Sequence, residues 1–509
     1  MHPVTGSRKR QRGITLIYGI AALIVTIPMV GMAVDVGILY NTKAQLQAAV
    51  DGAALAAARA LNLGSSTSSQ ITSAQTNAQN WFFANFPSGV WGTSGTVMPA
   101  AVVADDPVNP RVRNVRVSAS TNVPAYFMRL LNFNTTSISA IGNAARRDVV
   151  VMLVLDRSGS MNSNNGCANM INASKIFTGQ FAAGRDQIGM VTFGETISMA
   201  AAPSNTFQTT LGYSNASGTG SGLIDTIVCN GWTGTPGAMS VGYNELFKTN
   251  LPGALNIVMF MTDGLPNVVV ANYQTRMKTN SLCKDSAGVA ISGGGNMSAN
   301  PRAWYPSVAL GGLFGTIPAG PIGAIGEGFG VNRWYSATNN PSTYSQGTAT
   351  TTAAPGCAFP SNTANFTSDI SGFPENDIFG NSLSGYRAIN RVTSGAYTGQ
   401  IRADQATNTD DISFNTSDSA ATQARTNTTL QAYVFGVGLG GTTGTPPDYR
   451  LMQRMTNDPN ADLYNTPALY GAYSNIPTQP VGTFIYASNP GQLNSAFLKI
   501  SSMILRLSQ

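Results

Sequence analysis

The chain carries one carboxylate and two hydroxyls at alternate positions in the stretch 156–160, Asp-Arg-Ser-Gly-Ser. An apolar run, Val149 to Leu155, precedes this stretch directly. Seven consecutive apolar residues with neither helical nor alternating spacing predict a strand buried on both faces, as in a parallel sheet. Open α/β sheets bind ligands at the carboxyl ends of such strands. The oxygen donors that follow this strand suit Mg²⁺, Ca²⁺ or Mn²⁺, and not a metal that prefers thiolates.

A second carboxylate follows a second apolar run. Residues 256–262 predict another short strand, and Asp263 and Gly264 come directly after it. Between the two predicted strands, the stretch 231–235, Gly-Trp-Thr-Gly-Thr, places hydroxyls just before a predicted helix, 238–248. The sequence therefore supplies oxygen donors from three separate places along the chain.

The three motifs D-R-S-G-S, G-W-T-G-T and M-T-D-G, in this order, resemble the metal-ion-dependent adhesion site of the von Willebrand factor type A domain. The resemblance implies that Ser158, Ser160 and sometimes Thr233 contact the ion, while Asp156 and Asp263 largely hold its waters. Two carboxylates against a divalent ion leave little surplus negative charge, so the resemblance implies a protein partner that offers an acidic residue. The alternative is a serine-rich loop that caps a helix without a metal.

The composition excludes several kinds of function. Charged residues make up 10% of the chain, against about 25% in ordinary soluble proteins. The net charge of +6 comes mostly from four basic residues within the first twelve, so no nucleic-acid-binding surface is predicted. The one histidine is His2, which removes Ser-His-Asp, Cys-His and histidine-ligated zinc chemistry from the rest of the chain. We therefore expect no enzyme.

The four cysteines show no C-x-x-C spacing, so disulfides are favoured over a zinc site if their compartment is oxidising. The resemblance to the type A metal site brings the loop after residue 160 together with the loop before residue 231. We therefore expect Cys167 to pair with Cys229, and Cys283 with Cys357. Free buried thiols are the alternative.

Residues 14–34 are 21 uncharged, mostly apolar residues, which as a helix span about 31 Å and match the roughly 30 Å hydrocarbon core of a membrane. The basic cluster Arg-Lys-Arg-Gln-Arg just before them predicts a cytoplasmic N-terminus and an extracytoplasmic bulk. A cleaved signal peptide is the alternative, but the apolar run exceeds the usual length for one.

The N-terminal sequence resembles that of TadG-like proteins, components of bacterial tight-adherence (Flp) pilus systems. The resemblance is carried by R-G-I-T-L, the apolar span, A-V-D-V-G-I-L-Y and the alanine-rich stretch Q-L-Q-A-A-V-D-G-A-A-L-A-A-A-R-A-L. It implies a place in the bacterial inner membrane and partners among pilus or envelope components. Tyr18 stands where pilin-like subunits usually carry Glu, which favours a permanent anchor over cleavage by a prepilin peptidase.

These observations predict four segments: a basic tail 1–13, a transmembrane helix 14–34, a TadE/TadG-like pilin-like α+β region 35–147, and a type A domain 148–509 with an insertion at about 272–428. The expected fold of the last segment is α/β, a Rossmann-like, mostly parallel sheet flanked by helices. Further strands are expected at 187–193, 430–437 and 483–487, and helices at 169–181 and 490–505.

Two polar stretches are expected to lack regular structure. The Ser/Thr/Gln-rich residues 64–77 are typical of a linker. The acidic residues Asp410, Asp411 and Asp418, with Asn408, lack the spacing of an EF-hand and favour a solvated loop.

Taken together, the sequence predicts a membrane-anchored, metal-dependent protein-binding module of pilus assembly or surface adhesion. The alternative is a structural stalk or scaffold of the envelope, in which the metal only stabilises the fold.

Overall fold

The computed structural model divides the chain into two units, residues 1–146 with 509, and residues 147–508. The residues that it describes are 12–64, 66–194, 197–216, 218–230, 233–266, 268–271, 274–275, 283–284, 290–291, 312–315, 370–372, 375–377, 379–391, 393, 398–401, 406–443, 446–460 and 473–508.

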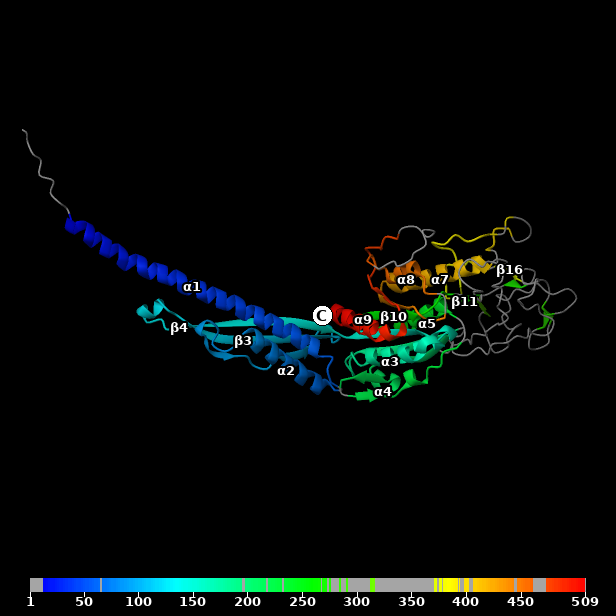
Figure 1. The fold of residues 1–509 in the computed structure, drawn as a ribbon, viewed down its shortest axis with the longest axis horizontal. Helices are drawn as coiled ribbons and strands as arrows, with labels where there is room; N and C mark the ends of the chain where they lie inside the picture. Colours follow the sequence, from blue (N-terminus) through cyan, green and yellow to red (C-terminus); the bar gives the residue numbers. More distant parts are fainter. Residues whose placement is uncertain are drawn as a thin grey trace, which may run out of the picture. The chain divides into compact units, whose positions relative to one another are not determined.

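The first unit combines two helices with a four-stranded sheet (Figure 1). The helices are α1, Arg12–Ala60, and α2, Thr67–Asn85. The central strand is β3, with which the other three strands pair. β1 and β2 pair antiparallel with its later and earlier residues. The strands are β1, Ser94–Val97; β2, Val102–Asp105; β3, Val112–Pro124; and β4, Thr135–Arg147.

Helix α1 joins an apolar segment to the core of the first unit. Most side chains between Leu16 and Val34 are exposed, whereas Ala49, Ala53 and Ala57 are buried against α2 and β3. Small side chains on this face allow the elements to approach closely. Within the described residues, α1 is the one helix long and apolar enough to cross a membrane.

Helix α2 corrects the expectation of a linker at 64–77. Ser66 caps the helix by accepting a hydrogen bond from the backbone of Ser69, and the Ser69 hydroxyl accepts one in return from the backbone of Ser66. One face of the helix is buried, through Ala74, Ala78 and Phe82. The helix was not predicted from the composition of 64–77, because most polar residues of this stretch occupy exposed positions of the helix or its N-terminal cap.

The second unit contains a six-stranded sheet in the order β18-β17-β10-β5-β6-β7. Neighbouring strands are parallel except β6 and β7, which are antiparallel. Counted along the chain from β5, this is the doubly wound order 3-2-1-4-5-6, whose direction reverses between β5 and β10. The strands are β5, Val149–Asp156; β6, Gln187–Phe193; β7, Ile197–Ser204; β10, Leu255–Thr262; β17, Tyr433–Leu439; and β18, Phe484–Ala487.

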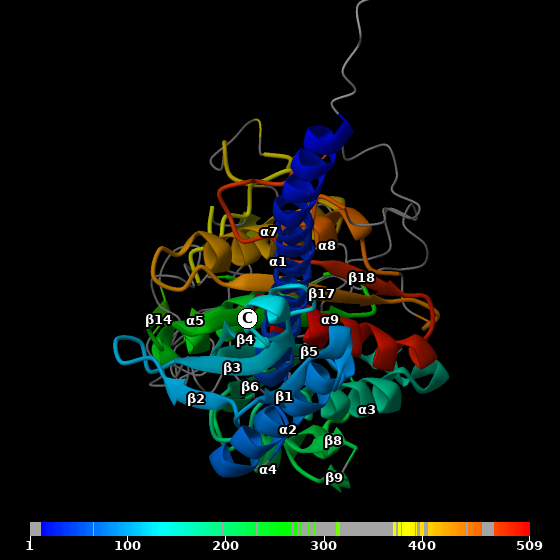
Figure 2. The same cartoon turned by 90° about the vertical axis from the view of Figure 1, so that its left-hand side faces the viewer.

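Helices cover both faces of this sheet (Figure 2). Helices α3, Gly166–Thr178, and α9, Leu493–Leu507, pack on one face with the odd-numbered residues of β5. On the other face lie α5, Thr235–Thr249; α7, Ala406–Thr426; and α8, Tyr449–Thr456. The predicted α/β class with a mainly parallel sheet is confirmed at this level.

Shorter elements complete the described part of the second unit. They include a short helix and paired strands: α4, Phe207–Leu211; β8, Tyr213–Asn215, with β9, Gly218–Gly220; β11, Val268–Ala271, with β15, Gly312–Gly315; β12, Gln274–Thr275, with β16, Ile370–Gly372; and β13, Cys283–Lys284, with β14, Ala290–Ile291.

The interval expected as an insertion, about 272–428, contains α7, a helix of the core. Phe414, Ala421 and Ala424 of this helix are buried in the same cluster as residues of β5 and β10. The acidic residues expected in a solvated loop lie on α7 instead. Most of the interval before 375 falls outside the described residues.

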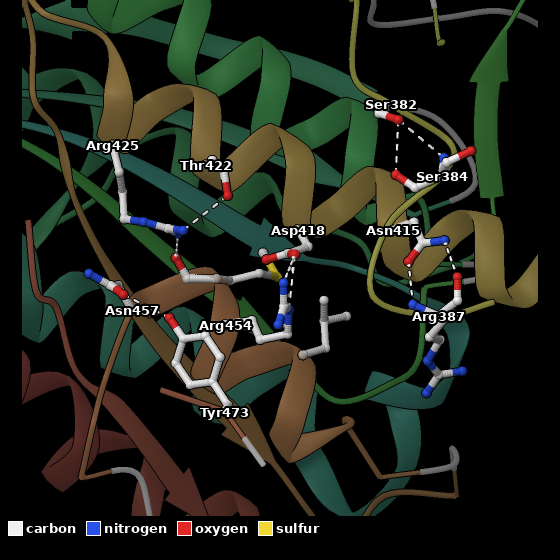
Figure 3. A network of polar contacts seen from close by, with 12 residues as sticks. Ser382, Ser384, Arg387, Asn415, Asp418, Thr422, Arg425, Arg454, Asn457 and Tyr473 are labelled. Atoms are coloured by element: carbon white, nitrogen blue, oxygen red, sulfur yellow. Dashed lines mark hydrogen bonds and ion pairs between the residues drawn. The ribbon is translucent and has the colours of Figure 1, made fainter. Parts of the chain in front are cut away.

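A polar network fastens residues 379–391 to α7 (Figure 3). The Asn415 side chain of α7 accepts from the Arg387 backbone N–H at 2.9 Å and donates to the Arg387 carbonyl at 2.9 Å. The Arg387 guanidinium pairs with Asp411 at 3.0 Å and with Asp448 at 3.2 Å. Arg454 of α8 pairs with Asp418 at 2.7 Å. Asp411 and Asp418 of α7 are therefore matched by arginines that are distant in the sequence.

Candidate metal centre

Asp156 ends β5 at the point where the strand order of the sheet reverses. All eight residues of β5 are buried, as the continuous apolar run predicts for a strand covered on both faces. The chain turns directly after Asp156, and one carboxylate oxygen, Oδ1, accepts the backbone N–H of Ser158 at 2.7 Å. This bond orients the carboxylate and holds the following loop over the end of the strand.

Asp263 follows β10, the neighbouring strand across the reversal, and meets the two serines of the first loop. Its Oδ1 accepts a hydrogen bond from the Ser160 hydroxyl at 2.8 Å and one from the Ser158 hydroxyl at 3.3 Å. The two hydroxyl oxygens are 3.1 Å apart. These three oxygens form a triangle, and four of the five predicted site residues are thus brought together by direct bonds around it.

Thr262 is a member of this cluster that the sequence reasoning missed. Its hydroxyl donates to Asp156 Oδ2 at 2.6 Å, and it accepts the N–H of Gly264 at 3.2 Å. Thr262 therefore links the ends of both strands. The available signal was a hydroxyl at the last position of a fully buried strand, next to Asp263.

Thr233, the fifth predicted residue, is buried just before α5. The loop before it is tied to the first loop, since the Asn230 N–H donates to the Arg157 carbonyl at 2.6 Å. A disulfide between Cys167 and Cys229 crosses between the same two regions. This is one of the two pairings expected from the sequence. The other, between Cys283 and Cys357, stays a prediction, because the Cys283 side chain and the whole of Cys357 lie outside the described residues.

The loop after β17 contacts the loop after β5. The Ser163 and Thr443 hydroxyls are 2.7 Å apart, and Asn164 Nδ2 donates to the Gly441 carbonyl at 2.6 Å. Loops after three of the parallel strands therefore meet at one edge of the sheet, as expected for a ligand site of a doubly wound fold.

The two carboxylates raise each other's cost of ionisation. Burial, and then the negative charge of Asp263, raises the pKa of Asp156 to about 7. Burial also raises the pKa of Asp263. Within the described residues neither carboxylate forms an ion pair with Lys or Arg. The hydroxyls that face Asp263, from Ser160, Thr442 and Ser158, lower its pKa but do not offset the effect of burial. A cation at this position would neutralise both groups.

The donor set fits a small, hard cation. Mg²⁺ binds oxygen at about 2.1 Å in an octahedron, so adjacent ligands lie about 3 Å apart. The triangle formed by Ser158 Oγ, Ser160 Oγ and Asp263 Oδ1 has sides of 3.1, 2.8 and 3.3 Å, close to that spacing. The described residues hold no group of three or more His, Cys, Asp or Glu side chains suited to a metal, so hydroxyls and water must supply the other ligands here.

Comparison with known proteins finds a family match for the N-terminal segment. Residues 13–60 match the family described as putative Flp pilus-assembly TadE/G-like. This segment contains the apolar part of α1 and its alanine-rich continuation, the stretch on which the sequence resemblance rested. A search of curated protein sequences finds no match.

Solved structures of pilus proteins resemble the chain at a distance. They include the pilus adhesin SpaC from Lactobacillus rhamnosus GG (12% identity, TM-score 0.33, 80% of this chain and 36% of that chain). They also include the vWF domain of the type V pili tip protein Mfa5 from Porphyromonas gingivalis (14%, 0.32, 72% and 98%), and the PilB minor pilin from Streptococcus sanguinis (11%, 0.31, 81% and 79%). The chain spans about a third of the SpaC chain that it matches.

Proposed function

We propose that this protein is a membrane-anchored, extracytoplasmic module that binds a partner protein through a divalent cation, in Flp pilus assembly or surface adhesion. The second unit would be a von Willebrand factor type A domain, and its ion Mg²⁺, with Ca²⁺ or Mn²⁺ as substitutes. The match of residues 13–60 to the TadE/G-like family supports the pilus setting. The proposal includes no catalysis.

The observation that carries the proposal is the oxygen triangle beside two buried carboxylates. Ser158, Ser160 and Asp263 present three oxygens at the spacing of one octahedral face, and the buried Asp156 accepts the Ser158 backbone N–H. Such an ion would keep exposed coordination positions, because Ser160 is only partly buried. A carboxylate from a partner protein has the charge and the oxygen donors to complete the shell.

The anchoring part of the proposal rests on α1. Its apolar segment, 14–34, has the length of a single membrane span, and the basic residues before it favour a cytoplasmic N-terminus. The proposed location is therefore the bacterial inner membrane, with both units outside the cytoplasm. The partners would then be pilus or envelope proteins.

A capture experiment tests the binding function. The detergent-solubilised full chain is incubated with envelope and pilus proteins, once with Mg²⁺ and once with a chelator. Ser160→Ala removes one oxygen of the triangle. Ser204→Ala is the matched control, because it makes the same change at the end of β7, beside the beginning of β6, where the Ser204 hydroxyl is bonded to Thr206.

Capture that requires Mg²⁺, persists in Ser204→Ala and disappears in Ser160→Ala supports the proposal. The same captured set in every condition contradicts it. That result would favour the second candidate, a structural stalk or scaffold, which the continuous helix α1 and its buried alanine face support.

A further inference from the structure

The connection between β3 and β4, residues 125–134, is fastened to α1 by one carboxylate. Asp35 is buried, and it accepts the backbone N–H groups of Tyr126, Phe127 and Met128 at 2.9, 2.9 and 2.7 Å. Burial by itself favours the neutral acid, but the three N–H donors outweigh it and hold the pKa of Asp35 below its ordinary value. The connection is therefore held to α1 by charge-assisted hydrogen bonds.

A close contact places the same connection beside the apolar segment of the helix. A Cβ atom on Gly31 would lie 2.6 Å from Phe127 Cβ, so only glycine admits Phe127 at this distance. Gly31 lies four residues, or about 6 Å, before Asp35 along the helix. Phe127 therefore packs against the last turn of the 14–34 segment. The backbone of the connection is bonded to Asp35, the residue that follows this segment.

Aromatic side chains of the connection are exposed although they are large and apolar. Tyr126 is 49% exposed, Phe127 43% and Phe133 59%. Arg129 is the one charged residue in the stretch 125–134, and it too is exposed. Exposed rings with a basic residue are characteristic of protein segments at the boundary between lipid and water.

We propose that the connection 125–134 is a second membrane contact, which lies in the headgroup layer of the outer face of the membrane that α1 crosses. Tyr126, Phe127 and Phe133 would insert at the edge of the hydrocarbon, and Arg129 would face lipid phosphates. Asp35 and Gly31 are the positioning residues, because they set the depth of the connection. The inference rests on the proposed span of α1, since the end of that span fixes where the interface lies.

Tryptophan quenching by lipids brominated on their acyl chains measures this depth. The full chain is reconstituted in phosphatidylcholine and phosphatidylglycerol vesicles, with or without bromine. Phe133→Trp reports on the connection, and the unsubstituted chain, with its five tryptophans, provides the baseline. Val108→Trp is the matched control, because Val108 is 91% exposed and lies beyond the opposite end of β3, about 40 Å away.

We expect brominated lipids to reduce the added emission of Phe133→Trp and to leave that of Val108→Trp unchanged. Asp35→Ala, combined with Phe133→Trp, should diminish the quenching because the connection loses its attachment to α1. Equal emission of Phe133→Trp in both kinds of vesicle would overturn the inference. The same result is expected if a protein, and not lipid, covers these rings.

A further variant separates this inference from the anchor itself. Leu23→Trp lies in the middle of the apolar segment of α1, where its side chain is exposed. If Leu23→Trp is quenched and Phe133→Trp is not, the span stands and the second contact is wrong. If Leu23→Trp is not quenched, the anchor and the second contact are both wrong.

Discussion

The second unit holds carboxylates in two contrasting surroundings, fully buried in one and partly buried in the other. At the edge of the sheet, Asp156 and Asp263 lie beside each other and beside hydroxyls. On the side of α7 and α8, Arg387 lies between Asp411 and Asp448, and its guanidinium carbon is 3.3 Å from the centre of the Phe414 ring. Both regions shield negative charge from water, but among the described residues only the second contains a cation that balances it.

The difference shows what is missing at the sheet edge. An unpaired buried carboxylate is strongly disfavoured in a medium of low dielectric constant. Around α7 the chain supplies arginines, and the Arg387 charge counteracts the effect of burial on the pKa of Asp411. At Asp156 and Asp263 the described residues supply hydroxyls alone, so a cation from solution is the natural complement.

We expect the largest change in stability when Arg387 is removed, because Asp411 and Asp448 then lack a cation, as Asp156 and Asp263 do among the described residues. Arg387→Met keeps an apolar stem over Phe414 but leaves Asp411 and Asp448 without their cation. We expect the free energy of unfolding to fall by about 3 to 5 kcal/mol. Chemical denaturation of the full chain in detergent micelles, followed by circular dichroism, measures this. A fall below about 1 kcal/mol would show that the pairs do not support the fold.

A third carboxylate, Asp377, tests the intermediate case, in which N–H groups donate to the carboxylate and no described residue pairs with it as a cation. It accepts from the backbone of Phe379 and Asn381, yet burial raises its pKa to about 6. The folded chain thus binds this proton more tightly than the unfolded chain. Stability should fall by about 3 kcal/mol as the pH rises from about 4 to about 6, and stay level above that.

Denaturation of the parent chain and Asp377→Asn across this pH range isolates the contribution, which is the difference between the two curves. Glu375→Gln is the matched control: the bond to Arg391 lowers the pKa of Glu375, so this residue should give a slope of the opposite sign, and only at the acid end of the range, below about pH 4.5. Parallel curves for the parent chain and Asp377→Asn would refute the prediction.

Mg²⁺ should stabilise the chain only through the site at Asp156 and Asp263. If the ion binds the folded chain, stability should rise by about 2.7 kcal/mol at a free concentration one hundred times its dissociation constant. Asp263→Asn should abolish this response, and in chelator it should stabilise the chain because it removes a buried like charge. Thermal unfolding with and without Mg²⁺ measures both effects.

Asp418→Asn is the control for that experiment. It breaks the pair with Arg454, so it should destabilise the chain while the response to Mg²⁺ persists. Loss of the response in Asp418→Asn as well would show that Mg²⁺ acts elsewhere or without specificity.

The smallest effect should come from an exposed pair. Arg391 and Glu375 are 2.6 Å apart, but their side chains are 39% and 59% exposed. Water and salt screen such a pair, so Arg391→Gln should change the free energy of unfolding by about 0 to 1 kcal/mol. Chemical denaturation of Arg391→Gln in parallel with Arg387→Met checks this prediction. Equal losses of unfolding free energy in the two variants would mean that burial does not distinguish the two arginines.

Much of the α/β framework was predictable because its signals are local. The runs 149–155 and 257–261 are continuous and apolar, and Asp156 and Asp263 come soon after them, so strand and turn follow from neighbouring residues. Helix α2 was missed because its apolar face consists of widely spaced residues within a polar stretch. Asp411 and Asp418 were assigned to a loop because their partners, Arg387 and Arg454, are more than twenty residues away in the chain.

The sequence by itself determined the types of donor, the strands that carry them and the TadE/G-like segment, since each depends on residues close together in the chain. Only the tertiary structure decided that Thr262 bonds Asp156, that Asp35 holds residues 126–128, and that the two carboxylates at the sheet edge face no arginine among the described residues. The reason is physical. The energy of a charge depends on its burial and its neighbours, and folding brings those neighbours from distant parts of the chain.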